Sequence, residues 1–152
     1  MRIPPEEAVN LDFSNADYVS SWVKQQRDFP MNPARTKLFD CGAALTNFHV
    51  TPDGWLQPCI VLDRPGHDLQ NGSFQEGWIQ VLSRLHDQPV PADYACTTCE
   101  KRPLCPSCPA LGRLECGSAE SVPSYLCAIG HYRHQGVVAA LQATSQHDRR
   151  TA

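Results

Sequence analysis

Eight cysteines constrain this chain more than any other feature of its sequence, because four of them fall within only thirteen residues. These four form two pairs with the spacing C-x2-C, one at residues 96–99 and one at residues 105–108. Thiols at this density bind metal, form disulfides or remain unmodified, and a C-x2-C pair in a loop directs two thiolates toward one metal centre. The sequence therefore predicts a protein that binds metal through sulfur.

Composition and charge narrow the classes of protein. No apolar run has the length of a membrane span or of a signal-peptide core, so we expect a cytoplasmic protein that contacts no membrane. In a reducing cytosol, paired cysteines serve as metal ligands or redox groups rather than as disulfides. Thirteen basic and sixteen acidic side chains leave a formal net charge of −3, and no basic cluster indicates a nucleic-acid partner.

The chain is short of apolar residues for its length. Its 152 residues suffice for one domain with one modest core, but only 41% are hydrophobic and 13 prolines interrupt the backbone. Bound metal would supply the missing cross-links. We therefore expect a small α+β domain stapled by metal.

Three segments have the spacing of apolar residues that is typical of helices, at about residues 15–27, 74–86 and 124–142. The first two follow serines, at positions 14 and 73, that can act as N-caps. Residues 1–13 are interpreted either as a short helical turn or as a linker, and the polar residues 144–152 as a frayed tail.

Residues 45–60 read as a β-hairpin, with Gly54 in its turn, where glycine adopts positive φ without steric cost. An antiparallel return brings Cys41 and Cys59 to the same end of the ribbon, where they can share a metal. Residues 61–72 are expected to form a loop.

Residues 95–123 contain the cysteine pairs together with many prolines and glycines, and we expect them to be irregular. Only five residues separate Cys99 from Cys105, whereas a zinc ribbon separates its two pairs by about fifteen to twenty. So short an interval favours a tight wrap around a larger object, such as a cuboidal iron–sulfur cluster.

The order of the cysteines resembles the SPASM domain, the C-terminal extension of many radical S-adenosylmethionine enzymes that mature peptides and proteins. That pattern runs C, nine to fifteen residues, G, four residues, C, then C-x2-C-x5-C-x3-C after a gap, and a last C after another. The residues that fill it in order are Cys41, Gly54, Cys59, Cys96, Cys99, Cys105, Cys108 and Cys127. The resemblance covers about residues 38–135, with one departure: two residues rather than three separate Cys105 from Cys108.

The resemblance implies two auxiliary [4Fe–4S] clusters. The first would be held by Cys41, Cys59 and Cys108, and the second by Cys96, Cys99, Cys105 and Cys127. It also implies a division into a linker and helix at residues 1–37, an iron–sulfur domain at 38–143 and a polar tail at 144–152.

For several side chains near these cysteines, the sequence allows two different roles. Cys116, outside the pattern, is either a fourth ligand of the first cluster or a plain thiol. His131 and His134 share a helical face with Cys127 and are either ligands or solvated residues. Lys101 and Arg102 either tune a cluster through hydrogen bonds to sulfur or are solvated.

Iron–sulfur clusters transfer single electrons. The resemblance to the SPASM domain therefore implies that the two clusters relay electrons, help to hold the substrate, or do both. The chain contains no CxxxCxxC, the motif that holds the radical-generating cluster of the resembled enzymes, so it should not cleave S-adenosylmethionine alone. The expected partners are a radical SAM catalytic domain, in cis or in trans, and a peptide or protein substrate. One alternative is a structural zinc module for protein–protein contact, with one zinc ion on Cys96, Cys99, Cys105 and Cys108 and a second on the remaining thiols. The other alternative is a disulfide framework.

Overall fold

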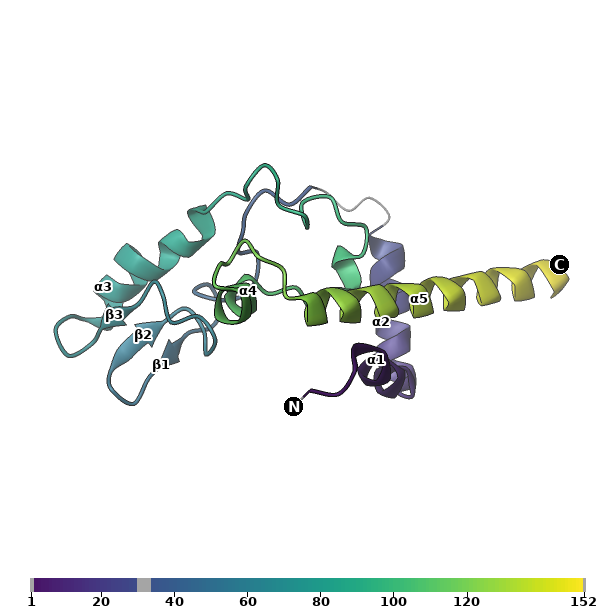
Figure 1. Ribbon diagram of the computed structural model, residues 1–152, viewed down its shortest axis with the longest axis horizontal. Coiled ribbons are helices and arrows are strands. Elements are labelled where there is room, and N and C mark those ends of the chain that lie inside the picture. Colours follow the sequence, from purple (N-terminus) through teal and green to yellow (C-terminus); the bar gives the residue numbers. More distant parts are fainter. Residues whose placement is uncertain (1, 30–33, 152) are drawn as a thin grey trace. The chain divides into compact units, whose positions relative to one another are not determined.

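The computed structural model describes residues 2–29 and 34–151, with side-chain surroundings up to residue 143. The elements combine α-helices with a three-stranded antiparallel sheet, as expected for a small α+β protein (Figure 1). The chain folds as two compact units, each made of separate segments. The helical unit comprises Met1–Ala34, Thr98–Ser107 and Pro123–Ala152, and the sheet unit comprises Arg35–Thr97 and Cys108–Val122.

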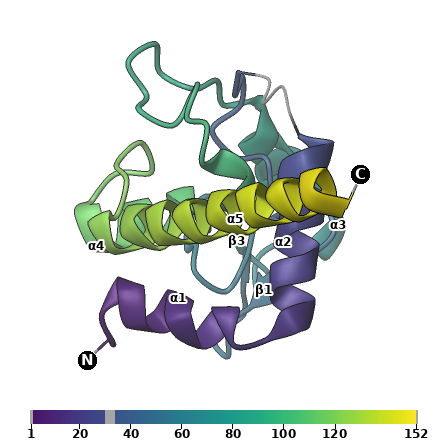
Figure 2. The same cartoon turned by 90° about the vertical axis from the view of Figure 1, so that its right-hand side faces the viewer.

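The helical unit contains α1 (Pro5–Phe13), α2 (Ala16–Asp28) and α5 (Ser124–Thr151), which pack on one another (Figure 2). Phe13 of α1 contacts the ring of Trp22 with ring centroids 5.4 Å apart. Arg133 of α5 lies over the same indole, 4.7 Å from its centroid, and pairs with Asp12 at 3.0 Å. These contacts fix α5, the helix that carries Cys127, within the unit.

The predicted helix at 15–27 is confirmed as α2, although its cap is Asn15 rather than the serine before it. The Asn15 side chain accepts a hydrogen bond from the backbone N–H of Asp17 at 2.9 Å. Ser14 instead donates to the carbonyl of Leu11 at 2.6 Å. Residues 1–13 contain α1, whose proline at the first helical position and acidic first turn suit a helix start.

The prediction that the last helix ends near residue 142 is wrong, because α5 continues to Thr151. No glycine or proline follows Gly136, and the alanine, glutamine and arginine residues of the tail favour helix. The predicted frayed tail is therefore helical in its backbone, while its side chains lie outside the described residues.

The sheet unit contains β1 (His49–Val50), β2 (Trp55–Gln57) and β3 (His67–Asp68) in the order β1-β2-β3. The hairpin is confirmed: His49 pairs with Gln57, and Gly54 has φ +87° in the turn. The loop predicted at 61–72 is partly wrong because it contains β3, whose Leu56–His67 pairing adds a third strand. Two residues are too few to show an alternating pattern in sequence.

The helix predicted at about 74–86 is confirmed at this position, but its hydrogen-bonding pattern changes along its length. It begins as α3 (Phe74–Glu76), continues as a π-helix over Gly77–Leu82 and ends as a 3-10 helix over Ser83–Asp87. Ser73 caps it as predicted, in a capping box with Glu76. Its apolar face supplies Leu82 and Leu85 to the buried core of the sheet unit.

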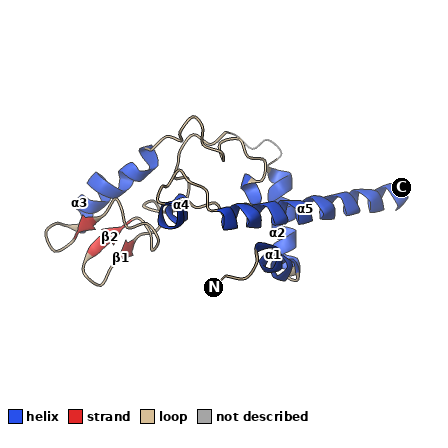
Figure 3. Cartoon of the chain, in the orientation of Figure 1, coloured by secondary structure: helices blue, strands red, loops and turns tan. Residues whose placement is uncertain are grey.

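The predicted irregular region at 95–123 is mostly loop (Figure 3), but it contains a 3-10 turn, Arg102–Leu104, and a further helix, α4 (Pro109–Cys116). Pro109 occupies the first helical position and Gly117, with φ +82°, ends the helix. The many prolines and glycines led us to expect an irregular segment, whereas these two residues mark the start and the end of a helix. Within the described ranges, no helix combines the length and apolar character that a membrane crossing needs.

Candidate metal-ligand sites

All eight cysteines are reduced thiols in the structure. Five lie in the sheet unit and three in the helical unit. The sheet unit contains Cys41, Cys59, Cys96, Cys108 and Cys116, and the helical unit contains Cys99, Cys105 and Cys127. The cysteines expected to hold the first cluster therefore belong to one unit.

A short loop follows Cys41 and is hydrogen-bonded to the segment that carries Cys59. The carbonyl of Gly42 accepts the backbone N–H groups of residues 45–47, which closes the loop on itself. The N–H of Ala44 donates to the carbonyl of Pro58 at 3.1 Å, next to Cys59 in the sequence. Hydrogen bonding thus connects the segments of two predicted ligands, while their sharing of a metal stays a prediction.

Cys59 and Cys108 occupy surroundings that suit thiolate ligands. Both are half-buried and pack against the hydrophobic core of the sheet unit. The backbone N–H of Leu62 donates to the Cys59 sulfur at 3.4 Å, the kind of hydrogen bond that tunes a ligated thiolate. Cys108 is the N-cap residue of α4, where the positive end of the helix dipole favours an anionic sulfur.

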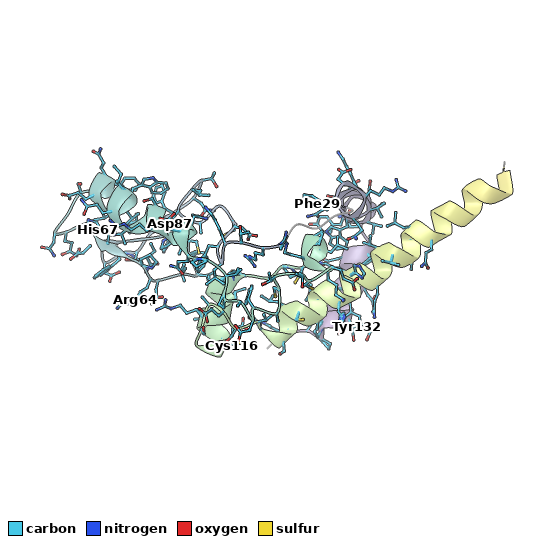
Figure 4. The ribbon with its side chains drawn as sticks, turned by 90° about the horizontal axis from the view of Figure 1, so that it is seen from above. Phe29, Arg64, His67, Asp87, Cys116 and Tyr132 are labelled. Atoms are coloured by element: carbon cyan, nitrogen blue, oxygen red, sulfur yellow. The ribbon has the colours of Figure 1, made fainter. Side chains whose placement is uncertain are left out.

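Cys116, which is labelled in Figure 4, is the last residue of α4. Cys108 is the N-cap residue at the other end of this helix. Eight residues at a helical rise of 1.5 Å separate the two positions by about 12 Å along the axis. The thiol of Cys116 is exposed. Nothing in α4 brings it toward Cys108, so its role as a fourth ligand remains a prediction that the helix does not favour.

In the helical unit, Cys105 lies directly against α5. Its sulfur is 3.8 Å from the carbonyl oxygen of Leu126, and a Cβ added at Gly130 would fall only 2.8 Å from that sulfur. Cys127 precedes Gly130 by three residues, so the two share a face of the helix. Gly130 therefore allows Cys105 to approach the turn of α5 that contains Cys127. Gly130 was not singled out from the sequence, although a glycine inside a helical pattern is a signal for such a close contact.

Arg102 connects Cys99 to Cys105. Its backbone N–H donates to the Cys99 carbonyl at 3.2 Å, and its carbonyl accepts the Cys105 N–H at 3.2 Å. Within the part of the chain that the structure describes, its buried Nη1 atom has no hydrogen-bond partner. A buried guanidinium nitrogen without an acceptor, held between two cysteines, suits an anionic group bound at their thiolates.

Lys101 interacts electrostatically with two cysteines of the helical unit, Cys99 and Cys127. Its pKa is raised, chiefly by the hydrogen bond to Glu100 at 3.0 Å, with further contributions from Cys99 and Cys127. The pKa of Glu100 is lowered, first by Lys101. Lys101, paired with Glu100, thus lies beside two thiols of the helical unit.

The two histidines of the predicted ligand face, His131 and His134, act on the charge of Glu100 and lower its pKa by smaller amounts than Lys101 does. Their role as metal ligands remains a prediction. Among the residues with described side chains, no three His, Cys, Asp or Glu residues form a group that could hold a single metal ion.

Comparison with known proteins gives no relative of this chain: no family model, curated protein or solved structure matches it.

Proposed function

We propose that this chain is an auxiliary iron–sulfur domain that binds two [4Fe–4S] clusters in a radical SAM system that modifies peptides or proteins. The observation that carries the proposal is the order of the cysteines, in which seven of the eight follow the SPASM pattern with one spacing changed. The surroundings of the individual thiols support it.

The first cluster is assigned to Cys41, Cys59 and Cys108, all in the sheet unit. Support comes from the Ala44–Pro58 hydrogen bond between the first two segments and from the Leu62 N–H donated to the Cys59 sulfur. The position of Cys116 about 12 Å along α4 from Cys108 favours three protein ligands and an iron open to substrate or solvent.

The second cluster is assigned to Cys96, Cys99, Cys105 and Cys127. The contact of Cys105 with α5 and the turn between Cys99 and Cys105 support the three ligands of the helical unit. Arg102 contributes an unpartnered buried donor, which fits the net negative charge of a thiolate-ligated cluster. The fourth ligand, Cys96, comes three residues before Cys99 in the sequence and belongs to the sheet unit.

The bound clusters would accept and pass single electrons, at potentials set by burial, charge and hydrogen bonds to sulfur. The chain supplies the thiolates, the N–H donor at Cys59 and the cationic side chains of Lys101 and Arg102. The radical itself must come from a catalytic domain that carries CxxxCxxC, in cis or in trans, and the substrate is a peptide or protein held near the clusters.

Anaerobic purification followed by iron and acid-labile sulfide analysis tests the proposal. Two clusters predict about eight irons and about eight sulfides per chain. Stoichiometric zinc without sulfide would establish the zinc module instead, and four disulfides without metal would establish the disulfide framework. Electron paramagnetic resonance of the dithionite-reduced protein adds the signature of the clusters and separates them from adventitious iron.

A further inference from the structure

His86 is a buried polar side chain that neither cluster assignment uses. Only 8% of the residue is exposed, and it comes from the 3-10 helix Ser83–Asp87. Its Nδ1 atom lies 3.0 Å from the carbonyl oxygen of Phe39, and its Nε2 atom lies 2.6 Å from the carbonyl oxygen of Ala43. The two carbonyls belong to the residues two positions before and two positions after Cys41.

The histidine therefore spans the loop that presents Cys41. Phe39 and Ala43 are themselves buried, at 3% and 4% exposure, while Cys41 between them is exposed. A buried carbonyl without a donor is costly, so the loop depends on the ring for its present path. Each ring nitrogen faces one carbonyl oxygen, and a ring N–H is the only hydrogen-bond donor that the side chain offers.

The remaining hydrogen bonds of the loop reinforce this arrangement. Ala44, adjacent to the second anchored carbonyl, has the unusual φ of +56° and donates to Asn47 and Pro58. Any change in the path between Phe39 and Ala43 would be transmitted to this strained residue, and through it to the segment of Cys59.

We propose that His86 is a positioning residue for the first cluster: it holds the backbone on both sides of Cys41 so that the thiol is presented together with the thiol of Cys59. This inference rests on the proposed function, because it assigns His86 a role toward the cluster held by Cys41, Cys59 and Cys108. It concerns a side chain that does not itself ligate iron.

The test compares two substitutions at this position with a matched control. H86F retains an aromatic ring without any donor, and H86Q retains an N–H₂ donor. The control is H67Q, since His67 lies in the same unit and its buried Nε2 has no partner among the described residues. Each full-length variant is first measured without metal, by the rate of amide hydrogen exchange of residues 44–47. After reconstitution, two further measurements are made: the electron paramagnetic resonance signal of the first cluster and the rate at which iron is released to a chelator.

We expect H86F to speed amide exchange in the loop and iron release from the first cluster by about tenfold or more, because a buried carbonyl loses its donor. The resonance signal of the first cluster should change while that of the second is retained. H86Q should lie between H86F and the wild type, and H67Q should match the wild type in all three measurements.

Wild-type values for H86F in iron release and in the first-cluster signal would overturn the inference, even if exchange in the loop were faster. If H86F does not fold, H86Q decides: faster iron release supports the inference, and an unchanged rate overturns it. A wild-type protein that contains no iron and no sulfide would refute the proposed function and the cluster role of His86 together. If the wild type holds two clusters and H86F matches it in iron release and in the first-cluster signal, only the inference about His86 is refuted.

Discussion

Replacing Gly130 with alanine should disturb the second cluster far more than it disturbs the fold. The added Cβ would lie 2.8 Å from the Cys105 sulfur, 2.9 Å from its Cβ and 3.2 Å from its Cα. Contacts this short to both side chain and backbone cannot be relieved by rotating the thiol alone. Cys105 must therefore move away from α5 and from the turn that contains Cys127.

The cost to stability has two opposing parts. Forcing an extra methyl group into a packed contact costs about 1–3 kcal/mol. Alanine in a helix interior is about 1 kcal/mol more favourable than glycine. The net destabilisation of Gly130→Ala should therefore be about 0–2 kcal/mol, small enough for the protein to remain folded.

Gly136→Ala is the matched control, because it places a methyl group in the same helix and against Phe13, a ring with no metal-binding atom. Both variants carry the same helix-propensity gain and the same kind of clash, so urea unfolding of the metal-free proteins should show similar losses. After reconstitution, G136A should retain about eight irons, while G130A should show lower iron occupancy and an altered signal from the second cluster.

Equal iron content and identical spectra in G130A and G136A would refute the reasoning, since Cys105 would then not be a ligand held against α5. A loss of iron in G136A of the same size would attribute the effect to α5 packing rather than to the thiol.

Four further substitutions test the site and the fold. Cys127→Ala should remove the second cluster and leave about four irons, whereas Cys116→Ala should leave about eight; equal iron in both variants would contradict the ligand assignment. Arg102→Met removes a positive charge that favours the reduced state of the second cluster. Its midpoint potential should fall by on the order of 60 mV, which is about 1.4 kcal/mol for one electron. A dye-mediated redox titration measures this shift, and a rise in the potential would contradict the prediction. Ser73→Ala should cost about 0.5–2 kcal/mol in urea unfolding at neutral pH. Hydrogen bonds from Ser73 lower the pKa of Glu76. The stability that these bonds add is therefore present above the unfolded-state pKa of Glu76 and is lost as the pH falls through its folded-state pKa. If the difference in unfolding free energy between wild type and S73A grew in acid, this reasoning would be contradicted.

The sequence allowed the larger elements to be predicted because their signals are local. The apolar spacing and the proline that follows fixed the helix now seen as Ala16–Asp28, and the Asp53-Gly54 turn fixed the hairpin. The helix Pro109–Cys116 was missed because a segment rich in proline and glycine was expected to be irregular, whereas Pro109 is the first residue of this helix and Gly117 is its C-cap. The strand His67–Asp68 could not have been found, since it is a strand only through its pairing with β2.

For the candidate site, the sequence determined which atoms are available: the thiols, their order, and the spacing that favours clusters over a zinc ribbon. These features follow from the covalent sequence alone, so they are known before the fold is known. Only the tertiary structure decided how the thiols are supported, because hydrogen bonds such as those from His86 to the carbonyls of Phe39 and Ala43 join residues more than forty positions apart. The approach of Cys105 to Gly130 has the same origin: two segments distant in sequence touch only after helix packing has placed them.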